Sequence, residues 1–290
     1  MTNFKAACIQ NNAQNNINDN LPIVRSLIRE AVNLKADFIA LPECVSLMEP
    51  DAKALEAKAP EENDHPFLSM YEDEAKSSGA WILGGTLAVK ITDKETENKV
   101  ANRLYLFNPL GKIAATYDKI HMFDVDLGNG LSYKESATYS PGNRAVVTPL
   151  PWGNLGLSIC YDIRFAYLYR ALAQAGANIL CAPSAFTKIT GRAHWHILQR
   201  ARAIETGCFV ISPGLCGNHA QGKETYGHSV IIDPWGEVLA DAGPDVGVIT
   251  AEINMDKVTE ARHKVPALTH DATFKLNKGD KLKDDLKISI

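Results

Sequence analysis

Leu155-Gly156-Leu157-Ser158-Ile159-Cys160-Tyr161-Asp162-Ile163-Arg164-Phe165 is the stretch of this chain from which its fold and chemistry are best inferred. The apolar first half predicts a buried β-strand that ends at Cys160, and a helical pattern begins at Phe165. Backbone N–H groups and the helix dipole at such a junction favour a thiolate. Cysteine is also among the most buried residue types, so packing alone is the alternative explanation. Cys160 is therefore a candidate nucleophile, to be judged by residues elsewhere in the chain.

The composition is that of an ordinary soluble globular protein. The chain has 290 residues, 46% hydrophobic and 22% charged, with a formal net charge of −4. This mild acidity argues against nucleic acid or an anionic membrane as a partner, and no apolar stretch approaches the roughly 20 residues of a spanning helix. Six cysteines are spread without the spacing of a disulfide scaffold, and no signal-peptide pattern opens the sequence. These features predict a cytoplasmic protein with free thiols.

Strands alternate with helices along the chain. Helices are expected over residues 21–36, 66–78, 165–175, 194–206 and 254–262, and strands over 4–9, 38–41, 81–87, 103–107, 112–117, 145–150, 155–160, 178–182, 208–212, 229–232, 238–240 and 246–253. Turn signals at 108–111 and 233–236 predict hairpins, and hairpins between helices favour stacked sheets covered by helices. Residues 118–143 lack periodicity, which is typical of a functional loop. We expect one domain over residues 1–274 and a charged C-terminal tail over 275–290.

Four side chains stand where catalytic chemistry could be built. Glu43 follows a strand and Lys119 opens the long loop. Glu135 lies late in that loop, and Cys160 ends the central strand. Attack on an amide carbonyl requires a thiolate, a base such as a carboxylate, and a cation or N–H donors for the oxyanion. Because Glu and Lys are usually solvated surface charges, these residues alone leave catalysis and surface charge both open.

Three stretches resemble motifs of the nitrilase, or carbon–nitrogen hydrolase, superfamily. They are Ala-Leu-Pro-Glu at 40–43, Tyr-Asp-Lys-Ile-His-Met-Phe at 117–123 and Ser-Ile-Cys-Tyr-Asp-Ile-Arg-Phe at 158–165, in the family's order. The resemblance extends over residues 4–274. It implies an α/β fold, a four-layer α-β-β-α sandwich, that assembles into a homodimer or a higher even oligomer.

The resemblance also implies a role for each candidate residue. Glu43 is the expected general base, Lys119 the oxyanion-stabilising cation and Cys160 the nucleophile. Glu135 matches a supporting glutamate that orients Lys119 and the substrate, and the backbone N–H of Tyr161 matches a second oxyanion donor. The expected partner is a small-molecule amide, with no cofactor and no metal.

Within the superfamily, Cys-Tyr-Asp-Ile-Arg-Phe at 160–165 resembles amidases, since nitrilases typically carry Trp-Glu after the cysteine. Runs at 183–186, 190–195, 200–206, 226–229 and 233–236 most resemble the deaminated-glutathione amidase branch, which cleaves an α-ketoglutaramyl group from cysteinylglycine. An ω-amidase acting on α-ketoglutaramate-type monoamides is the alternative, as is a hydrolase of N-carbamoyl compounds or nitriles. Ala166 and Arg192 stand where prolines are usual.

The candidates for the substrate pocket are Arg164, Phe186, Arg192 and His194. A buried substrate carboxylate needs a paired donor, and Arg164 or Arg192 could supply it. The alternative for Arg164 is a structural ion pair, for example with Asp162.

Other chemistries fit the sequence less well. A metal site at His194-x-His196 is disfavoured because residues two apart on a helix do not share a face, and no further ligand has zinc-finger spacing. A Cys–His protease would pair Cys160 with His194 or His228. The remaining alternative is a protein that kept the fold and lost catalysis. The presence of all four candidate catalytic residues argues against it.

Overall fold

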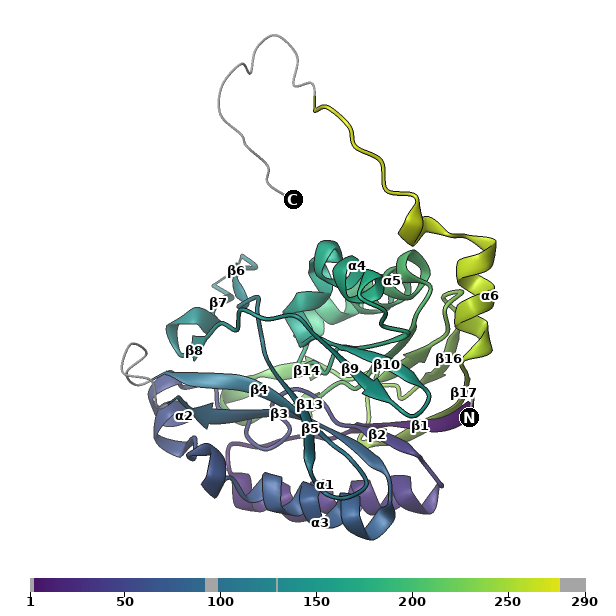
Figure 1. Ribbon diagram of the computed structural model, residues 1–290. Coiled ribbons are helices and arrows are strands. Elements are labelled where there is room, and N and C mark those ends of the chain that lie inside the picture. The colour runs from purple at the N-terminus through teal and green to yellow at the C-terminus, as the bar shows by residue number, and fades with distance from the viewer. Residues whose placement is uncertain (1–2, 92–98, 129, 277–290) are drawn as a thin grey trace, which may run out of the picture.

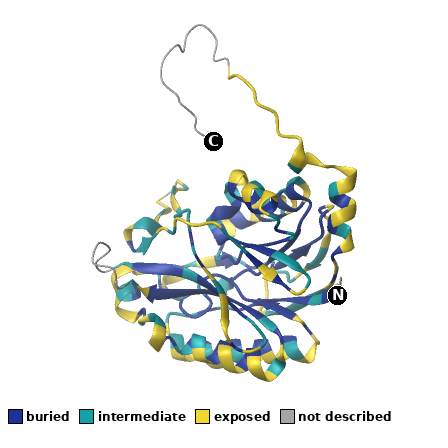
Figure 2. Cartoon of the chain, in the orientation of Figure 1, coloured by how far each residue is buried: buried dark blue, intermediate teal, exposed yellow. Residues whose placement is uncertain are grey.

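The computed structural model describes residues 3–91, 99–128 and 130–276. Two β-sheets pack face to face, and helices cover the outer face of each sheet (Figure 1). The buried residues lie between the sheets and beneath the helices (Figure 2). The expected four-layer α-β-β-α sandwich is therefore confirmed. Among the described residues, no helix has the length and apolar character needed to cross a membrane.

The first sheet has the strand order β17-β1-β2-β3-β4-β5, with β8 paired to β4. Its strands are β1 (Asn3–Gln10), β2 (Phe38–Ala40), β3 (Trp81–Lys90), β4 (Val100–Phe107), β5 (Ile113–Asp118), β8 (Tyr139–Ser140) and β17 (Gly247–Asn254). In β1, Ala6 and Cys8 face the core shared with the second sheet, whereas Ala7 and Ile9 face the helices. Helices α1 (Ile17–Asn33) and α3 (Pro66–Ser78) cover this outer face. A strand buried on both faces explains the continuous apolar run at the start of the chain.

The second sheet has the order β16-β15-β12-β11-β10-β9. Its strands are β9 (Val146–Leu150), β10 (Gly153–Leu157), β11 (Ile179–Cys181), β12 (Phe209–Ser212), β15 (Val230–Ile232) and β16 (Val238–Asp241). Helices α4 (Ala166–Gln174) and α5 (Lys188–Thr206) cover its outer face, and α6 (Asp256–Lys264) follows β17. The parallel neighbours β10, β11 and β12 place several loops at one edge of the sheet.

Two small hairpins and one short helix were not expected. They are β6 (Asp124–Asp126) with β7 (Ser132–Lys134), β13 (Cys216–Asn218) with β14 (Glu224–Tyr226), and α2 (Ala52–Lys58). The segment 118–143, expected as one long loop, in fact contains the short strands β6, β7 and β8. These strands are two or three residues long and partly exposed, so they carry no apolar alternation that sequence could reveal.

Capping residues explain where the helices begin. Asn16 accepts a hydrogen bond from the N–H of Asn18, so α1 begins at Ile17 and not at residue 21. Thr187 caps α5 in the same way, so this helix begins at Lys188, six residues before the expected start. The helix over 66–78 and its stop at Gly79, which has a φ of 71°, are confirmed. From residue 277 on, the expected C-terminal tail lies outside the described residues.

Candidate active site

Cys160 occupies a sharp turn between the second sheet and α4. Strand β10 ends at Leu157, and a short 3₁₀ helix over Cys160–Arg164 follows. The sequence predicted Cys160 as the last residue of the strand. In the structure it is instead the first residue of this turn. Its φ of 47° lies in the left-handed region, which costs a non-glycine residue about 1–3 kcal/mol. Such strain at a reactive side chain is typical of active sites.

The buried carboxylate of Asp162 holds the turn in place. Its Oδ2 accepts hydrogen bonds from the Tyr117 hydroxyl at 2.7 Å and from the Ile159 N–H at 2.9 Å. Its Oδ1 accepts from the His121 N–H at 3.0 Å. The ion pair with Arg164 considered from the sequence is therefore wrong, because these donors occupy both carboxylate oxygens.

Glu43, Lys119 and Glu135 form one buried charged network. The Lys119 ammonium donates to Glu43 Oε1 and to both carboxylate oxygens of Glu135, each at 2.8 Å. Glu43 is 3% exposed and Lys119 2% exposed. Residues from the end of β2, the end of β5 and the loop after β7 thus meet beside Cys160, as their order in the resemblance implied. Charges buried so deeply are stable only when paired in this way.

The network controls protonation at the sulfur. Burial, followed by the charge of Glu43, raises the pKa of the Cys160 thiol well above its ordinary value, while Lys119 acts in the opposite direction. Burial would lower the pKa of Lys119, but the carboxylates of Glu135 and Glu43 outweigh it and raise that pKa. The resting site therefore holds a neutral thiol, a lysine cation and a carboxylate base, and the thiolate expected from the sequence forms only when a base takes the proton.

Two neutral groups that sequence reasoning missed complete the network. The Asn102 amide donates to Glu43 Oε1 at 2.9 Å and to Glu135 Oε1 at 3.3 Å. The Ala185 N–H donates to Glu43 Oε2 at 2.8 Å. An asparagine in the apolar strand β4 was the available signal for the first group, whereas a backbone N–H leaves no signal in a sequence. Together they hold the Glu43 carboxylate in one orientation.

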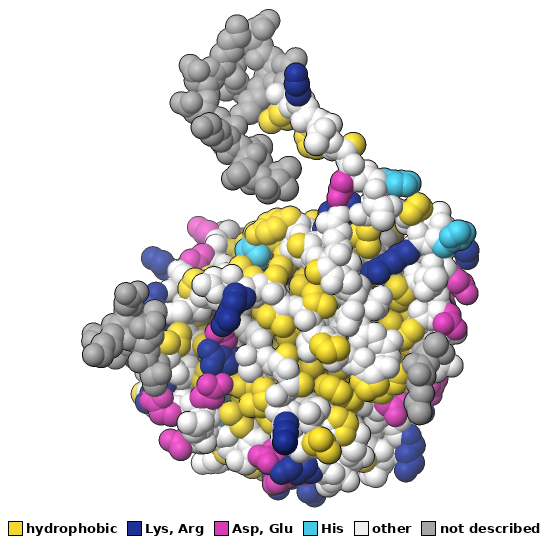
Figure 3. Space-filling view, in the orientation of Figure 1, with side chains coloured by type: hydrophobic (Ala, Val, Ile, Leu, Met, Phe, Trp, Pro, Cys, Tyr) yellow, Lys and Arg dark blue, Asp and Glu magenta, His cyan; other side chains and the backbone are white. Residues whose placement is uncertain are grey.

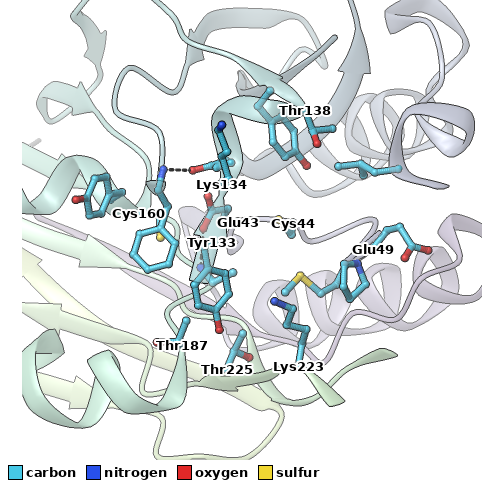
Figure 4. A pocket seen from close by; sticks show the side chains of 18 of the residues that line it. Glu43, Cys44, Glu49, Tyr133, Lys134, Thr138, Cys160, Thr187, Lys223 and Thr225 are labelled. Carbon is cyan, nitrogen blue, oxygen red and sulfur yellow. Dashed lines mark hydrogen bonds between the residues drawn. The ribbon is translucent and has the colours of Figure 1, made fainter. Parts of the chain in front are cut away.

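A cavity of about 310 Å³ is lined by Glu43, Cys160 and their neighbours (Figure 4). This volume lies at the lower end of the range for small-molecule sites. The polar and charged side chains that line the cavity include Glu43, Glu49, Lys119, Ser132, Tyr133, Lys134, Glu135, Thr138, Tyr139, Cys160, Tyr161, Thr187, Thr190, Lys223, Glu224 and Thr225. All four proposed catalytic side chains are in this set, so the structure brings them to one site.

The predicted pocket residues fare differently. Phe186 lines the cavity, but Arg164, Arg192 and His194 do not. The Arg164 guanidinium packs 5.8 Å from the Tyr161 ring centre and 5.6 Å from that of Phe186, and it contacts His194 Nδ1 at 3.3 Å. Arg192 and His194 are exposed on α5. The structure thus places these three side chains outside the cavity wall, because the Arg164 guanidinium packs on aromatic rings and the other two lie on the exposed side of α5.

A histidine cluster lies outside this cavity. His196 Nε2 donates to Asp241 Oδ2 at 2.7 Å, and His228 Nδ1 lies 2.9 Å from Asp241 Oδ1. The structure thus joins His196 to His228 and not to His194. Each ring is satisfied by the carboxylate, so hydrogen bonding accounts for the cluster. Neither His194 nor His228 lines the cavity with Cys160, which leaves a Cys–His protease without its base.

The fold and this site define a class of protein. The carbon–nitrogen hydrolase family model matches residues 5–263, so the chain belongs to the carbon–nitrogen hydrolase family. It is an amidase of that family, a hydrolase of small non-peptide amides.

Two individual relatives and one solved structure are similar to this chain over most of its length. The chain is similar to the deaminated glutathione amidase of Synechocystis sp. (strain PCC 6803 / GT-S), with 40% identity over 273 residues that cover 93% of this chain and 98% of that protein. It is similar to the omega-amidase NIT2 of Mus musculus, with 34% identity over 92% of this chain and 95% of that protein. The NitFhit protein of C. elegans superposes with a TM-score of 0.85 at 31% identity over 93% of this chain, which spans 65% of that longer protein.

Proposed function

We propose that Cys160 is the nucleophile that forms an acyl-enzyme with the substrate. The observation that carries this proposal is the buried Glu43–Lys119–Glu135 network beside a strained, protonated cysteine at the base of a cavity. A neutral thiol in contact with a fixed carboxylate has the base that it needs. No metal ligand set is required for this chemistry.

The reaction has two halves. Glu43 takes the Sγ proton of Cys160 as sulfur bonds to the amide carbonyl carbon, and the oxyanion is stabilised by the Lys119 ammonium. The N–H of Tyr161 is the second oxyanion donor, because it lies in the first turn of the 3₁₀ helix, where N–H groups lack helical acceptors. Glu43 then gives its proton to the departing nitrogen as the carbon–nitrogen bond breaks. In the second half Glu43 deprotonates a water that attacks the thioester, which releases the acid and restores the thiol.

Deaminated glutathione is the substrate we propose, cleaved to 2-oxoglutarate and cysteinylglycine. Relatives at 35–40% identity over about 93% of the chain carry the name deaminated glutathione amidase. The ω-amidase alternative is supported by relatives at 34% identity. The two substrates share an acyl group and differ in the leaving group, which is a dipeptide in one and ammonia in the other.

We further propose a cytoplasmic homodimer whose catalytic domain spans residues 1–274. All six cysteines are free thiols, which suits a reducing compartment. Helix α5 exposes Ile189, Ile197 and Ile204 on one side, at 59%, 70% and 54%. Tyr167 of the adjoining α4 is 64% exposed, and apolar side chains show at this upper edge in Figure 3. Large apolar side chains gathered on one layer are typical of a protein interface.

A substrate panel tests this function. The purified protein is assayed with deaminated glutathione, α-ketoglutaramate, an N-carbamoyl amino acid and a simple nitrile, each beside the Cys160→Ala variant. We expect the highest kcat/KM with deaminated glutathione and no turnover by the variant. A higher kcat/KM with α-ketoglutaramate would identify an ω-amidase, and turnover confined to the carbamoyl compound or the nitrile would contradict both candidates.

A further inference from the structure

We propose that Lys223 binds the terminal carboxylate of the leaving group and thereby selects a dipeptide amide over a simple amide. This inference rests on the proposed function. Deaminated glutathione carries a carboxylate on its glycine that α-ketoglutaramate lacks, so the enzyme can distinguish the two only through contacts to the leaving group.

Lys223 is placed at the mouth of the cavity, away from the catalytic residues. It stands just before β14, and its side chain points toward Tyr133 of β7 in Figure 4. The ammonium lies 4.2 Å from the centre of the Tyr133 ring. Two hairpins that are far apart in sequence thus meet around one cation.

This cation has no carboxylate partner. Among the described residues, no Asp or Glu oxygen lies within 4.0 Å of its ammonium, and the adjacent Glu224 pairs with Lys188 at 3.3 Å. Its partial burial lowers its pKa. A half-buried ammonium that contacts only an aromatic ring is stabilised when it binds an anionic ligand.

Charge elsewhere in the cavity excludes the other places for this carboxylate. At the base, Lys119 is shared between Glu43 and Glu135, so the three groups together carry one negative charge while the Cys160 thiol is protonated. A second carboxylate there would be repelled. Glu49 at the cavity wall is already paired with Lys58 at 2.6 Å. The free cation must therefore be sought at the mouth.

Burial places Lys223 on the side of the leaving group. Cys160, Glu43 and Lys119 are buried, whereas Lys223 is half-buried and Lys134 and Glu224 are exposed. A dipeptide leaves toward solvent, so its far end lies at the mouth while the acyl group stays on the sulfur. Thr225 and Thr187 line the same part of the cavity (Figure 4).

The test compares two substrates that differ in one charge. Deaminated glutathione and its terminal N-methylamide are assayed with the wild type and with Lys223→Met, by release of the free amine of the cysteine residue. We expect Lys223→Met to lower kcat/KM for the acid about 10- to 100-fold and to leave the N-methylamide unchanged. Lys223→Arg should keep most of the preference for the acid.

Two further variants serve as controls. Lys112→Met removes the same charge from an exposed lysine between β4 and β5, outside the cavity, and it should behave as the wild type. Lys134→Met removes the other lysine at the mouth.

Each remaining outcome overturns the inference. Equal losses on acid and N-methylamide would place Lys223 in a structural role or on the acyl carboxylate that both substrates carry. Loss of preference in Lys134→Met alone would move the site to that residue. Equal cleavage of the two substrates by the wild type would show that no cation binds the terminal carboxylate of the leaving group. If the wild type cleaves neither but hydrolyses α-ketoglutaramate, the proposed substrate is wrong and this inference fails with it.

Discussion

At the scale of the residue, the state of the Cys160 thiol decides the mechanism. Burial and the neighbouring Glu43 carboxylate raise its pKa, so the sulfur is protonated before substrate binds. Reactivity then depends on a base within the site and not on a preformed thiolate.

Removal of that base should stop acylation. We expect Glu43→Gln to lower kcat by about 10²–10⁴-fold, because the amide cannot accept the sulfur proton. Glutamine keeps the shape of the side chain, so the circular dichroism spectrum should match that of the wild type. Single-turnover release of the amine measures the step, and a burst of normal rate in the variant would show that another group activates the thiol.

Asn102 should act through Glu43 and not on the substrate. Asn102→Leu removes the amide that joins Glu43 to Glu135 and leaves a side chain of similar size. We expect kcat to fall about tenfold or more with KM little changed, as lost orientation of a base should affect the transition state alone. A changed KM with unchanged kcat would assign Asn102 to substrate binding.

At the scale of the element, helix α3 depends on a buried neutral histidine. His65 is 1% exposed, and its Nδ1 accepts from the Phe67 N–H at 3.3 Å as the cap of α3. Burial lowers the pKa of His65 to about 4. Below pH 6.5 the unfolded chain therefore binds a proton at His65 that the folded chain does not. The free energy of unfolding thus decreases as the pH is lowered from 6.5 to about 4.

This predicts a pH-dependent loss that one substitution removes. Between pH 7 and pH 4 the wild type should lose about 3 kcal/mol of unfolding free energy through His65. His65→Asn keeps a good cap but cannot titrate, so its stability should fall by that much less. Urea unfolding at pH 7, 6, 5 and 4 measures both proteins; parallel curves would contradict a neutral buried His65.

The elements show where sequence suffices. Pro66 and Gly79 bound α3 as the sequence predicted, because a first-turn proline and a left-handed glycine act locally. The sequence did not reveal the β13–β14 hairpin. These two strands are stabilised by pairing with each other, and neither has an alternation of apolar and polar residues that would predict a strand. Lys223 stands at that hairpin, so the contact that we propose for the leaving group could not be read from the sequence.

At the scale of the whole molecule, the exposed apolar side of α5 should join two copies of the chain. Ile197→Glu places a charge in this surface and should shift the protein from dimer to monomer in analytical ultracentrifugation. Ile23→Glu is the matched control, since Ile23 is 48% exposed on α1 in the opposite layer and should leave the dimer intact. A dimer that survives Ile197→Glu would place the interface elsewhere.

The packing of the whole molecule also explains which residues of the site could be predicted from the sequence. Glu43, Lys119, Glu135 and Cys160 were predicted from motifs, and the fold joins them across three loops. The sequence could not show that the Arg164 side chain packs on aromatic rings, because its distance from Cys160 in sequence carries no information on those contacts. Asn102 and the Ala185 N–H depend on which strands meet, which only the packed sandwich determines.

The acyl-enzyme is the most direct test of the mechanism. The wild type is mixed with deaminated glutathione, quenched in acid within milliseconds and digested for mass spectrometry. We predict that the peptide containing Cys160 gains the mass of the 2-oxoglutaryl group, minus the hydrogen displaced from sulfur, and that Cys160→Ala shows no adduct and no turnover. An adduct on a different residue, or turnover by Cys160→Ala, would contradict the assignment of the nucleophile.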